Sequence, residues 1–224
     1  MSESSSNPSK LVAAAEMPPI PDSSYEPQTS TSTLGDWGDQ LPIGFLAEGV
    51  FRREIKFKPY TMAAERDLAK HRKGAVEKNP AKLTAVVIAS MATEIGPYGD
   101  FQSLPFQQRL HVINQMYMGD VLYAYMLLRI NALGDEVSFE VACPACEKTS
   151  RLQASLEDVD LVIPEDPYSI VRTHSLHSSI KSGKGTIKQL HLQPPRWATM
   201  TKMKVHGKVS MGSVKYELVS AAIL

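Results

Sequence analysis

The sequence predicts an α+β fold that is mainly helical, with a projecting β-hairpin that carries a C-x-x-C motif at its tip. Apolar residues recur at helical spacing through much of residues 82–133. Two stretches with period-2 alternation flank the tetrapeptide "PACE". A strand, a proline turn and a helix are expected in residues 53–70 and again in residues 187–204. The similarity indicates either a repeated structural unit or a chance match between two short segments.

Composition limits the classes of partner. The chain has 224 residues, and its 24 basic residues equal its 24 acidic residues, so we expect no binding to nucleic acid. The longest apolar run, "VLYAYMLL" at residues 121–128, is much shorter than the roughly 20 residues of a membrane span. The first residues, "MSESSSNPSK", lack the basic start and apolar centre of a signal peptide. We therefore expect a chain without a membrane span in a reducing cytoplasm, where a structural disulfide would be unusual.

Residues 1–40 are predicted to form an extended or disordered arm. They are rich in Ser, Thr, Pro and acidic residues, and they have too few apolar side chains to offset the entropy of ordering. One interpretation is a disordered tail. The other is an interaction arm that becomes ordered against a neighbouring subunit, with Tyr25 and Trp37 as interface anchors.

Residues 41–135 are predicted to form a helical core domain. Apolar and charged residues alternate loosely in residues 51–58, which indicates a half-buried strand. Thr61 is a suitable N-cap for the helix "MAAERDLAKHRK", whose basic residues gather in the last turn. Asn79, which precedes a proline, begins a second helix whose apolar residues continue through residues 82–95.

Two further helices are expected before the hairpin. Phe106 begins "FQQRLHVINQMYMG", in which apolar residues recur at spacings of three and four. Gly119 and Asp120 are expected to separate it from the next helix, residues 121–135. That helix is apolar on nearly every side and should be the best buried element of the chain.

Residues 136–163 are predicted to form the β-hairpin, with "EVSFEVAC" and "KTSRLQASLED" as its strands. Residues 164–224 are predicted to contain a strand pair and C-terminal helices. The second strand–proline–helix segment matches the first when Pro194 is aligned with Pro59.

Four residues are candidates for a metal site. Cys143 and Cys146 have the spacing of a zinc knuckle, and His174 and His177 would complete a tetrahedral zinc site. The alternatives are a turn without metal and a disulfide. A redox function is not favoured, because no strand–helix pattern places the first cysteine at a helix N-terminus.

Enzyme motifs are missing from the sequence. It contains no G-x-G-x-x-G, P-loop, G-x-S-x-G or H-E-x-x-H pattern. The segment "KSGKGT" is interpreted as a turn between strands, since it lacks the spacing of a phosphate loop. The sequence therefore predicts a protein that is not an enzyme and that has no cofactor except for the zinc hypothesis.

The order of motifs in residues 41–162 is distinctive. "LPIG" is followed by a basic strand ending in "KPYT", then by "NPAKLTAVVIASMATEIG" and an acidic "LEDVDL". The most specific block is "MGDVLYAYMLLRINALGDEVSFEVACPACEK". This order resembles the baseplate protein family of T-even bacteriophages, whose relatives in contractile-tailed phages are called tail assembly or baseplate hub assembly proteins.

The resemblance implies a structural protein of the baseplate of a contractile phage tail or of a related injection device. Its partners would be other baseplate, hub or tail tube proteins, with several copies in a symmetric assembly. It would be present in the host cytoplasm during assembly and in the virion tail baseplate afterwards. An assembly chaperone absent from the finished particle is one alternative, and a small zinc-binding adaptor is another.

Overall fold

The computed structural model describes residues 29–72, 79–164, 166, 170–182 and 185–203. Helices and strands occupy nearly equal shares of these described residues. The fold is therefore α+β, but the prediction that it would be mainly helical is wrong. The reason is tertiary: several strands have weak sequence patterns of their own and exist because they pair with another segment.

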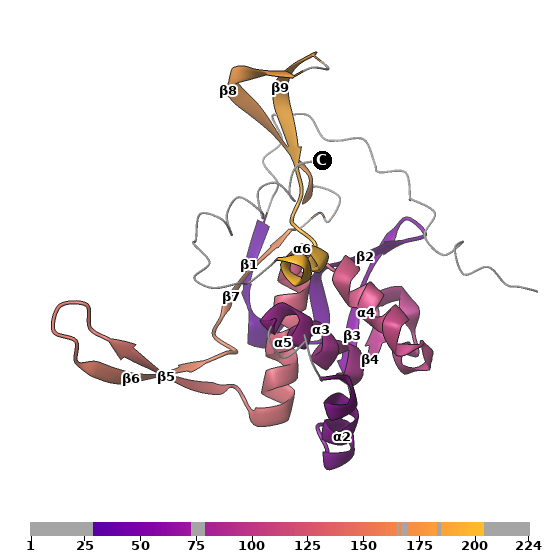
Figure 1. Ribbon diagram of the computed structural model, residues 1–224, viewed down its shortest axis with the longest axis vertical. Helices are drawn as coiled ribbons and strands as arrows, with labels where there is room; N and C mark the ends of the chain where they lie inside the picture. Colours follow the sequence, from indigo (N-terminus) through magenta and orange to yellow (C-terminus); the bar gives the residue numbers. More distant parts are fainter. Residues whose placement is uncertain (1–28, 73–78, 165, 167–169, 183–184, 204–224) are drawn as a thin grey trace, which may run out of the picture.

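The elements are arranged around one main core with a smaller apolar cluster beside it, and two hairpins project from this body (Figure 1). The α-helices are α1 (Leu34–Trp37), α2 (Met62–His71), α3 (Pro80–Met91), α4 (Phe106–Gln115), α5 (Met118–Leu133) and α6 (Trp197–Lys202), with short 3-10 helices η3 (Gly96–Tyr98) and η4 (Phe101–Ser103). The strands are β1 (Thr29–Thr33), β2 (Gln40–Ala47), β3 (Val50–Phe57), β4 (Ala92–Ile95), β5 (Glu136–Ala142), β6 (Thr149–Ser155), β7 (Asp160–Pro164), β8 (Arg172–Ser182) and β9 (Gly185–Leu192).

All four described sheets are antiparallel and small. β2, β3 and β4 form a three-stranded sheet, whereas β1–β7, β5–β6 and β8–β9 are two-stranded. In β7, Leu161 and Ile163 face the core and are 8% and 1% exposed, whereas Val162 between them is 70% exposed. β1 and α1 lie within the segment that the sequence assigned to an arm, and Leu34 is part of the core cluster. Residues 1–28 lie outside the described residues.

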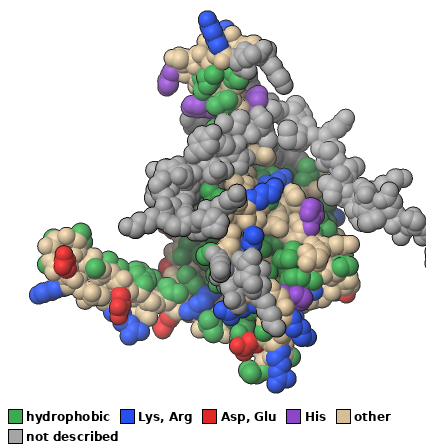
Figure 2. All heavy atoms as spheres, viewed as in Figure 1, with side chains coloured by type: hydrophobic (Ala, Val, Ile, Leu, Met, Phe, Trp, Pro, Cys, Tyr) green, Lys and Arg blue, Asp and Glu red, His purple; other side chains and the backbone are tan. Residues whose placement is uncertain are grey.

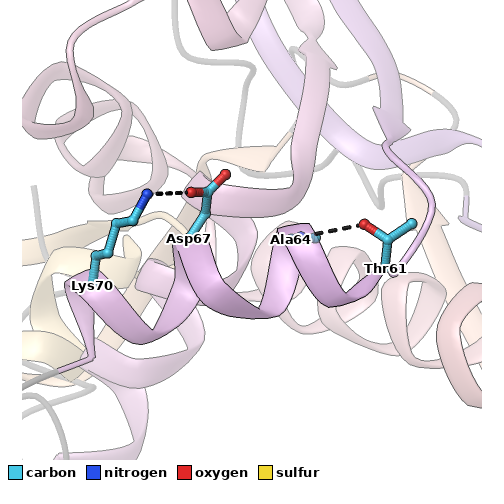
Figure 3. Close-up of polar contacts among 4 residues, drawn as sticks. All are labelled: Thr61, Ala64, Asp67 and Lys70. Carbon is cyan, nitrogen blue, oxygen red and sulfur yellow. Dashed lines mark hydrogen bonds and ion pairs between the residues drawn. The ribbon is translucent and has the colours of Figure 1, made fainter.

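The start of α2 is set by local chemistry that the sequence predicts. Thr61 has extended backbone angles, and its Oγ1 accepts a hydrogen bond from the N–H of Ala64 at 3.3 Å (Figure 3). Lys70 Nζ donates to Asp67 Oδ1 at 2.7 Å in the last turn of the helix. The N-cap prediction is confirmed. This ion pair is exposed to solvent and therefore contributes little to stability.

The next helix begins as predicted but ends earlier. Asn79 Oδ1 accepts from the amides of Ala81 and Lys82, at 3.0 and 3.2 Å, and Pro80 occupies the first turn of α3. The helix stops at Met91, and the following residues form β4 against β3, so the expectation of helix through residues 82–95 is wrong.

Two side chains donate hydrogen bonds to the carbonyl groups at the C-terminal end of α3. Arg109 of α4 donates from Nη1 to the carbonyl of Ala89 at 2.7 Å. Gln102 of η4 donates from Nε2 to the carbonyls of Ser90 and Ala92. Because these carbonyl groups have partners outside the helix, the chain can turn into a strand without leaving them unsatisfied.

The break between α4 and α5 differs from the prediction. It lies at Met116 and Tyr117, and α5 starts at Met118, so Gly119 and Asp120 are in the first turn of the helix and do not separate the two helices. The chain between β9 and α6 fills the break: Met118 N–H donates to the Pro195 carbonyl and Trp197 N–H donates to the Met116 carbonyl, each at 2.9 Å.

α3 and α5 contribute four residues each to the main core cluster, and α4, β4 and β7 contribute two each. Seven of the twelve residues of α3 are buried, compared with six of the sixteen in α5. α5 leaves Leu122 and Tyr125 each 44% exposed and Leu133 71% exposed. The expectation that this helix would be the best buried element is therefore wrong, and its apolar outer face lies in solvent.

Candidate interaction surfaces and the cysteine turn

A buried carboxylate connects the start of α5 to β2. Asp120 is fully buried, and its Oδ1 and Oδ2 accept hydrogen bonds from the backbone N–H groups of Ile43 and Gly44 at 2.8 and 2.9 Å. Both amides are available because the register of β2 against β3 shifts between Gln40 and Phe45. Asp120 therefore supplies the acceptors that a regular strand partner would have supplied.

Glycine is required beside this carboxylate. Gly44 has a φ of +85°, and a Cβ atom there would lie 2.4 Å from the carbonyl oxygen of Arg52 and 2.9 Å from Cγ of Arg53. Such distances exclude any side chain without a backbone shift. The "LPIG" and "MGD" motifs, which are far apart in the sequence, thus meet in one buried contact.

Burial determines the charge state of this carboxyl group. Removal from water raises the pKa of Asp120 to about 6, although the amides of Ile43 and Gly44 and the positive charges of Arg53 and Arg196 oppose the increase. The folded chain therefore binds this proton more tightly than the unfolded chain does, whose Asp has an ordinary pKa of about 3.9.

The raised pKa predicts a pH dependence of stability. Between about pH 4 and pH 6 the folded state binds more protons at Asp120 than the unfolded state, so this group's contribution to stability falls as pH rises through that window. We expect the free energy of unfolding of the wild type, relative to Asp120→Asn, to be higher at pH 4.5 than at pH 7. Urea unfolding at both pH values measures the difference, and an unchanged or opposite difference would contradict it.

Arg196 holds the C-terminal segment against the break between α4 and α5. Its guanidinium lies 4.5 Å from the ring centroid of Tyr117 and donates to the carbonyl of Gln115. Trp197, which is 3% exposed, donates from Nε1 to the Ala81 carbonyl of α3 at 3.0 Å. These contacts fix the position at which the β8–β9 hairpin joins the core.

Of the two predicted interface anchors, only Trp37 lies within the described residues; Tyr25 lies outside them. Trp37 is partly buried against the core, and the guanidinium of Arg53 lies 5.8 Å from the centroid of its ring. The indole of Trp37 thus contacts the body of its own chain. Its function as an interface anchor stays a prediction.

The hairpin formed by β5 and β6 confirms the strand pairing expected around "PACE". The register places Phe139 opposite Leu152, and these side chains are 47% and 46% exposed. Val141, on the same face, is 42% exposed. Glu140 and Arg151 form the pair next to them, on the opposite face. The hairpin projects from the core (Figure 1), so its apolar face is open to solvent.

The two cysteines lie in the turn between β5 and β6. Both are free thiols; Cys143 is partly buried and Cys146 is exposed. The Cys143 N–H donates to the Lys148 carbonyl at 2.9 Å, and the Glu147 N–H donates to the Cys143 carbonyl at 2.8 Å. The backbone amides of Ala145 and Cys146 lower the pKa of the Cys143 thiol by hydrogen bonding to its sulfur, with a further contribution from the Cys146 side chain.

The predicted histidine ligands lie elsewhere. His174 and His177 are exposed residues of β8, in the second projecting hairpin (Figure 1). Within the described residues no group of three or more His, Cys, Asp or Glu side chains is positioned to hold a metal ion. The structure therefore brings Cys143 and Cys146 together but does not bring the two histidines to them.

The β8–β9 hairpin differs in charge from β5–β6. Its strands contain Arg172, Lys181 and Lys188 and no acidic residue. Figure 2 shows basic and histidine side chains on this hairpin, whereas red acidic side chains occur on β5–β6. The register of β8 shifts between Ser175 and Ile180, which leaves extra residues of β8 opposite a short part of β9.

Sequence reasoning missed three structural residues. The sequence pattern predicts a break between helices at Asp120, and it indicates no particular role for Gly44 or Trp197. The available signals were a carboxylate in the first turn of an apolar helix and a Pro-Pro pair preceding a tryptophan. Neither signal names the partner, because both contacts are long-range.

Comparison with known proteins extends these findings. No curated protein and no solved structure shows a significant match. No helix among the described residues has the length and apolar character needed to span a membrane. The family model described as "T4 bacteriophage base plate protein" matches residues 48–203, a range that includes Asp120, both projecting hairpins and Trp197. The resemblance seen in the sequence is confirmed: the chain belongs to the T4 bacteriophage base plate protein family.

Proposed function

We propose that the protein is a structural component of the baseplate of a contractile bacteriophage tail or of a related contractile injection device. It acts through contacts between subunits and not as an enzyme. Its partners are other baseplate, hub or tail tube proteins, and several copies take part in a symmetric assembly. It is made in the host cytoplasm and becomes part of the virion tail baseplate. The family match supports the baseplate assignment.

The observation that carries a contact function is the exposed apolar face of β5–β6. A two-stranded hairpin has little core of its own and is only marginally stable in isolation. Here Phe139 and Leu152 face each other across the strands but remain nearly half exposed. Exposed apolar side chains grouped on a projecting element are typical of a surface that a partner covers.

The copy number of the chain in particles tests the proposal. Intact tails are purified from the phage or injection device that encodes the protein, and quantitative mass spectrometry compares this chain with the tail tube protein. A fixed stoichiometry, such as a multiple of three or six chains per tail, is expected for a baseplate component. Absence from finished tails, combined with loss of tail assembly when the gene is deleted, would show instead an assembly chaperone.

The apolar face of β5–β6 gives a matched pair of variants. Phe139→Ser with Leu152→Ser removes the exposed apolar pair, whereas Glu140→Ser with Arg151→Ser changes the neighbouring pair on the other face. We expect the first double variant to reduce incorporation into particles at least tenfold and the second to reduce it little. Cross-strand pairs contribute only about 0.2–1 kcal/mol, so neither should unfold the core.

The measurement is the amount of each variant in tails purified from complemented infections. Thermal unfolding of the isolated variants serves as the folding control. Equal incorporation of the two double variants would show that the apolar face is not a contact surface in the particle.

A further inference from the structure

We propose that the β8–β9 hairpin of one chain pairs edge to edge with the β5–β6 hairpin of a second copy, so that the two hairpins form one four-stranded sheet. The inference rests on the proposed function, because it names the partner that covers the β5–β6 contact surface. The contact is head to tail: each copy offers its β8–β9 hairpin to one neighbour and its β5–β6 hairpin to another.

Both hairpins are incomplete as sheets. β5–β6 and β8–β9 have two strands each, and no third described strand pairs with either of them. Their outer edges therefore present unpaired backbone N–H and C=O groups, which favour pairing with a strand of another chain. A two-stranded hairpin is only marginally stable, whereas a sheet of three or more strands with an apolar face is stable. Joining the two hairpins supplies the missing strands.

The registers indicate which edges meet. β5 and β6 pair without any shift along their whole length, so the outer edge of β5 is regular. The register of β8 against β9 shifts between Ser175 and Ile180, with the extra residues in β8, and such an irregularity opposes pairing at that edge. β9 keeps a regular outer edge. β5 and β9 are also similar in length, with seven and eight residues.

The exposed apolar side chains of the two hairpins match. Ile180 and Ile187 lie opposite each other in β8–β9 and are 51% and 38% exposed. Phe139 and Leu152 form a pair of the same kind in β5–β6. Pairing of β5 with β9 can place all four side chains on one face of the new sheet, where each pair packs beside the other and loses contact with water.

Charged side chains of opposite sign occupy the other face of each hairpin. On β5 they are Glu136 and Glu140, and on β8–β9 they are Lys181 and Lys188. None of these four side chains forms an ion pair with another described residue. The arrangement that joins the apolar pairs therefore also brings lysines beside glutamates, and oppositely charged neighbours stabilise strand pairing.

The distribution of charge along the chain favours a second copy as the partner. Residues 135–160 contain seven acidic and two basic side chains, whereas residues 172–192 contain four basic and no acidic ones, although the whole chain carries equal numbers of both. Arg151, which shares a face with the glutamates, donates to Ser138. Each hairpin thus has, on another copy of the same chain, a surface of complementary charge and similar apolar pattern.

The positions of the hairpins require two molecules. Figure 1 shows β5–β6 and β8–β9 leaving the core in different directions, with their tips well separated. The two hairpins of one chain therefore do not meet. A head-to-tail contact closes into a ring when the rotation between neighbours allows closure, and otherwise continues as an open chain of subunits.

Sedimentation velocity of the full chain tests the self-association. The protein is studied over a range of concentrations under a reductant, which keeps Cys143 and Cys146 as thiols. We expect concentration-dependent assemblies larger than dimers, because each copy has two different contact surfaces. Raising the ionic strength from about 0.05 to about 0.5 M should weaken the association, since salt screens exposed charges. A chain that remains monomeric up to its solubility limit would overturn the proposal.

Charge reversal identifies the surfaces. Lys181→Glu with Lys188→Glu makes β8–β9 acidic, and Glu136→Lys with Glu140→Lys makes β5–β6 more basic. Each double variant alone should associate roughly tenfold or more weakly than the wild type, because like charges then meet. An equimolar mixture should regain the association, since the altered β8–β9 of one variant faces the altered β5–β6 of the other.

A matched control excludes a general effect of net charge. Lys82→Glu with Lys202→Glu changes the charge by the same amount at exposed positions outside both hairpins, and it should associate like the wild type. Thermal unfolding of every variant serves as the folding control. Equal weakening by this control, or no recovery in the mixture, would refute the contact. Pairing of each hairpin with its own kind would leave the association of each variant unchanged, because like charges would replace like charges.

Failure of this inference is distinguishable from failure of the proposed function. Self-association is measured on the isolated chain, whereas the baseplate function is tested by the copy number in tails. A chain present in tails that does not associate with itself would support the baseplate function and refute the hairpin pairing. A chain that associates through both hairpins but never enters tails would do the reverse.

Discussion

Replacing Asp120 with alanine is expected to lower the free energy of unfolding by about 2–4 kcal/mol at pH 7, because two buried backbone donors lose their acceptor. The carboxylate accepts from Ile43 and Gly44, and Asp120 has no exposed surface. A neighbouring strand cannot replace it, because the register of β2 is shifted at this point. Urea unfolding followed by tryptophan fluorescence measures the loss.

Two further variants show whether the loss in Asp120→Ala comes from the buried hydrogen bonds. Asp120→Asn keeps one acceptor but turns an amide N–H₂ group toward the second backbone donor, so an intermediate loss is expected. Asp158→Ala removes an exposed carboxylate and should change stability by no more than about 0.5 kcal/mol. If Asp120→Ala cost no more than Asp158→Ala, the buried contact would not stabilise the fold.

Replacing Trp197 with alanine is expected to cost about 3–5 kcal/mol, the range for removing a large aromatic side chain from a core. Trp197 is 3% exposed, belongs to the core cluster and donates its indole N–H to the carbonyl of Ala81. The local loosening should be greatest where α6 covers the break between α4 and α5. Hydrogen exchange measured by mass spectrometry should show the largest increase in exchange rate, relative to the wild type, in residues 195–203.

Trp197→Phe distinguishes packing from hydrogen bonding. It keeps most of the ring volume but removes the donor to Ala81, and we expect about 1–3 kcal/mol of destabilisation. Lys202→Ala, at an exposed position of the same helix, is the control and should have little effect. Destabilisation by Lys202→Ala equal to that by Trp197→Ala would mean that α6 is held by its surface and not by the indole.

Local signals were sufficient for several elements. Thr61 and Asn79 cap the helices that the sequence assigned to them, because a capping side chain bonds to amides only two or three residues away. The strand, proline and helix expected in residues 53–70 and 187–204 are present as β3 with α2 and β9 with α6. Residues 204–224 lie outside the described residues, so the rest of the second unit stays a prediction.

Elements that depend on distant partners were not predictable in the same way. β1 pairs with β7 from far along the chain, and β4 continues what looked like a helix because β3 offers a pairing edge. The break between α4 and α5 lies where the Pro195 carbonyl and the Trp197 amide replace helical hydrogen bonds. In each case a contact between remote segments outweighed the local propensity.

The four predicted metal ligands show the same difference between local and long-range contacts. The sequence placed Cys143 and Cys146 in a hairpin turn, since the two alternating stretches that flank them pair locally. It could not determine whether His174 and His177 reach that turn, and the structure places them in a separate hairpin.

By itself, the sequence determined the capped helices, the cysteine hairpin and the family of this protein, because each depends on patterns within short stretches of chain. The tertiary structure alone decided that strands are as abundant as helices in the part of the chain that the structure describes, that Asp120 is buried against Ile43 and Gly44, and that Trp197 fills the break between two helices. The physical reason is that buried polar groups require partners and core side chains require neighbours, and the folded chain supplied both from segments that are far apart in sequence.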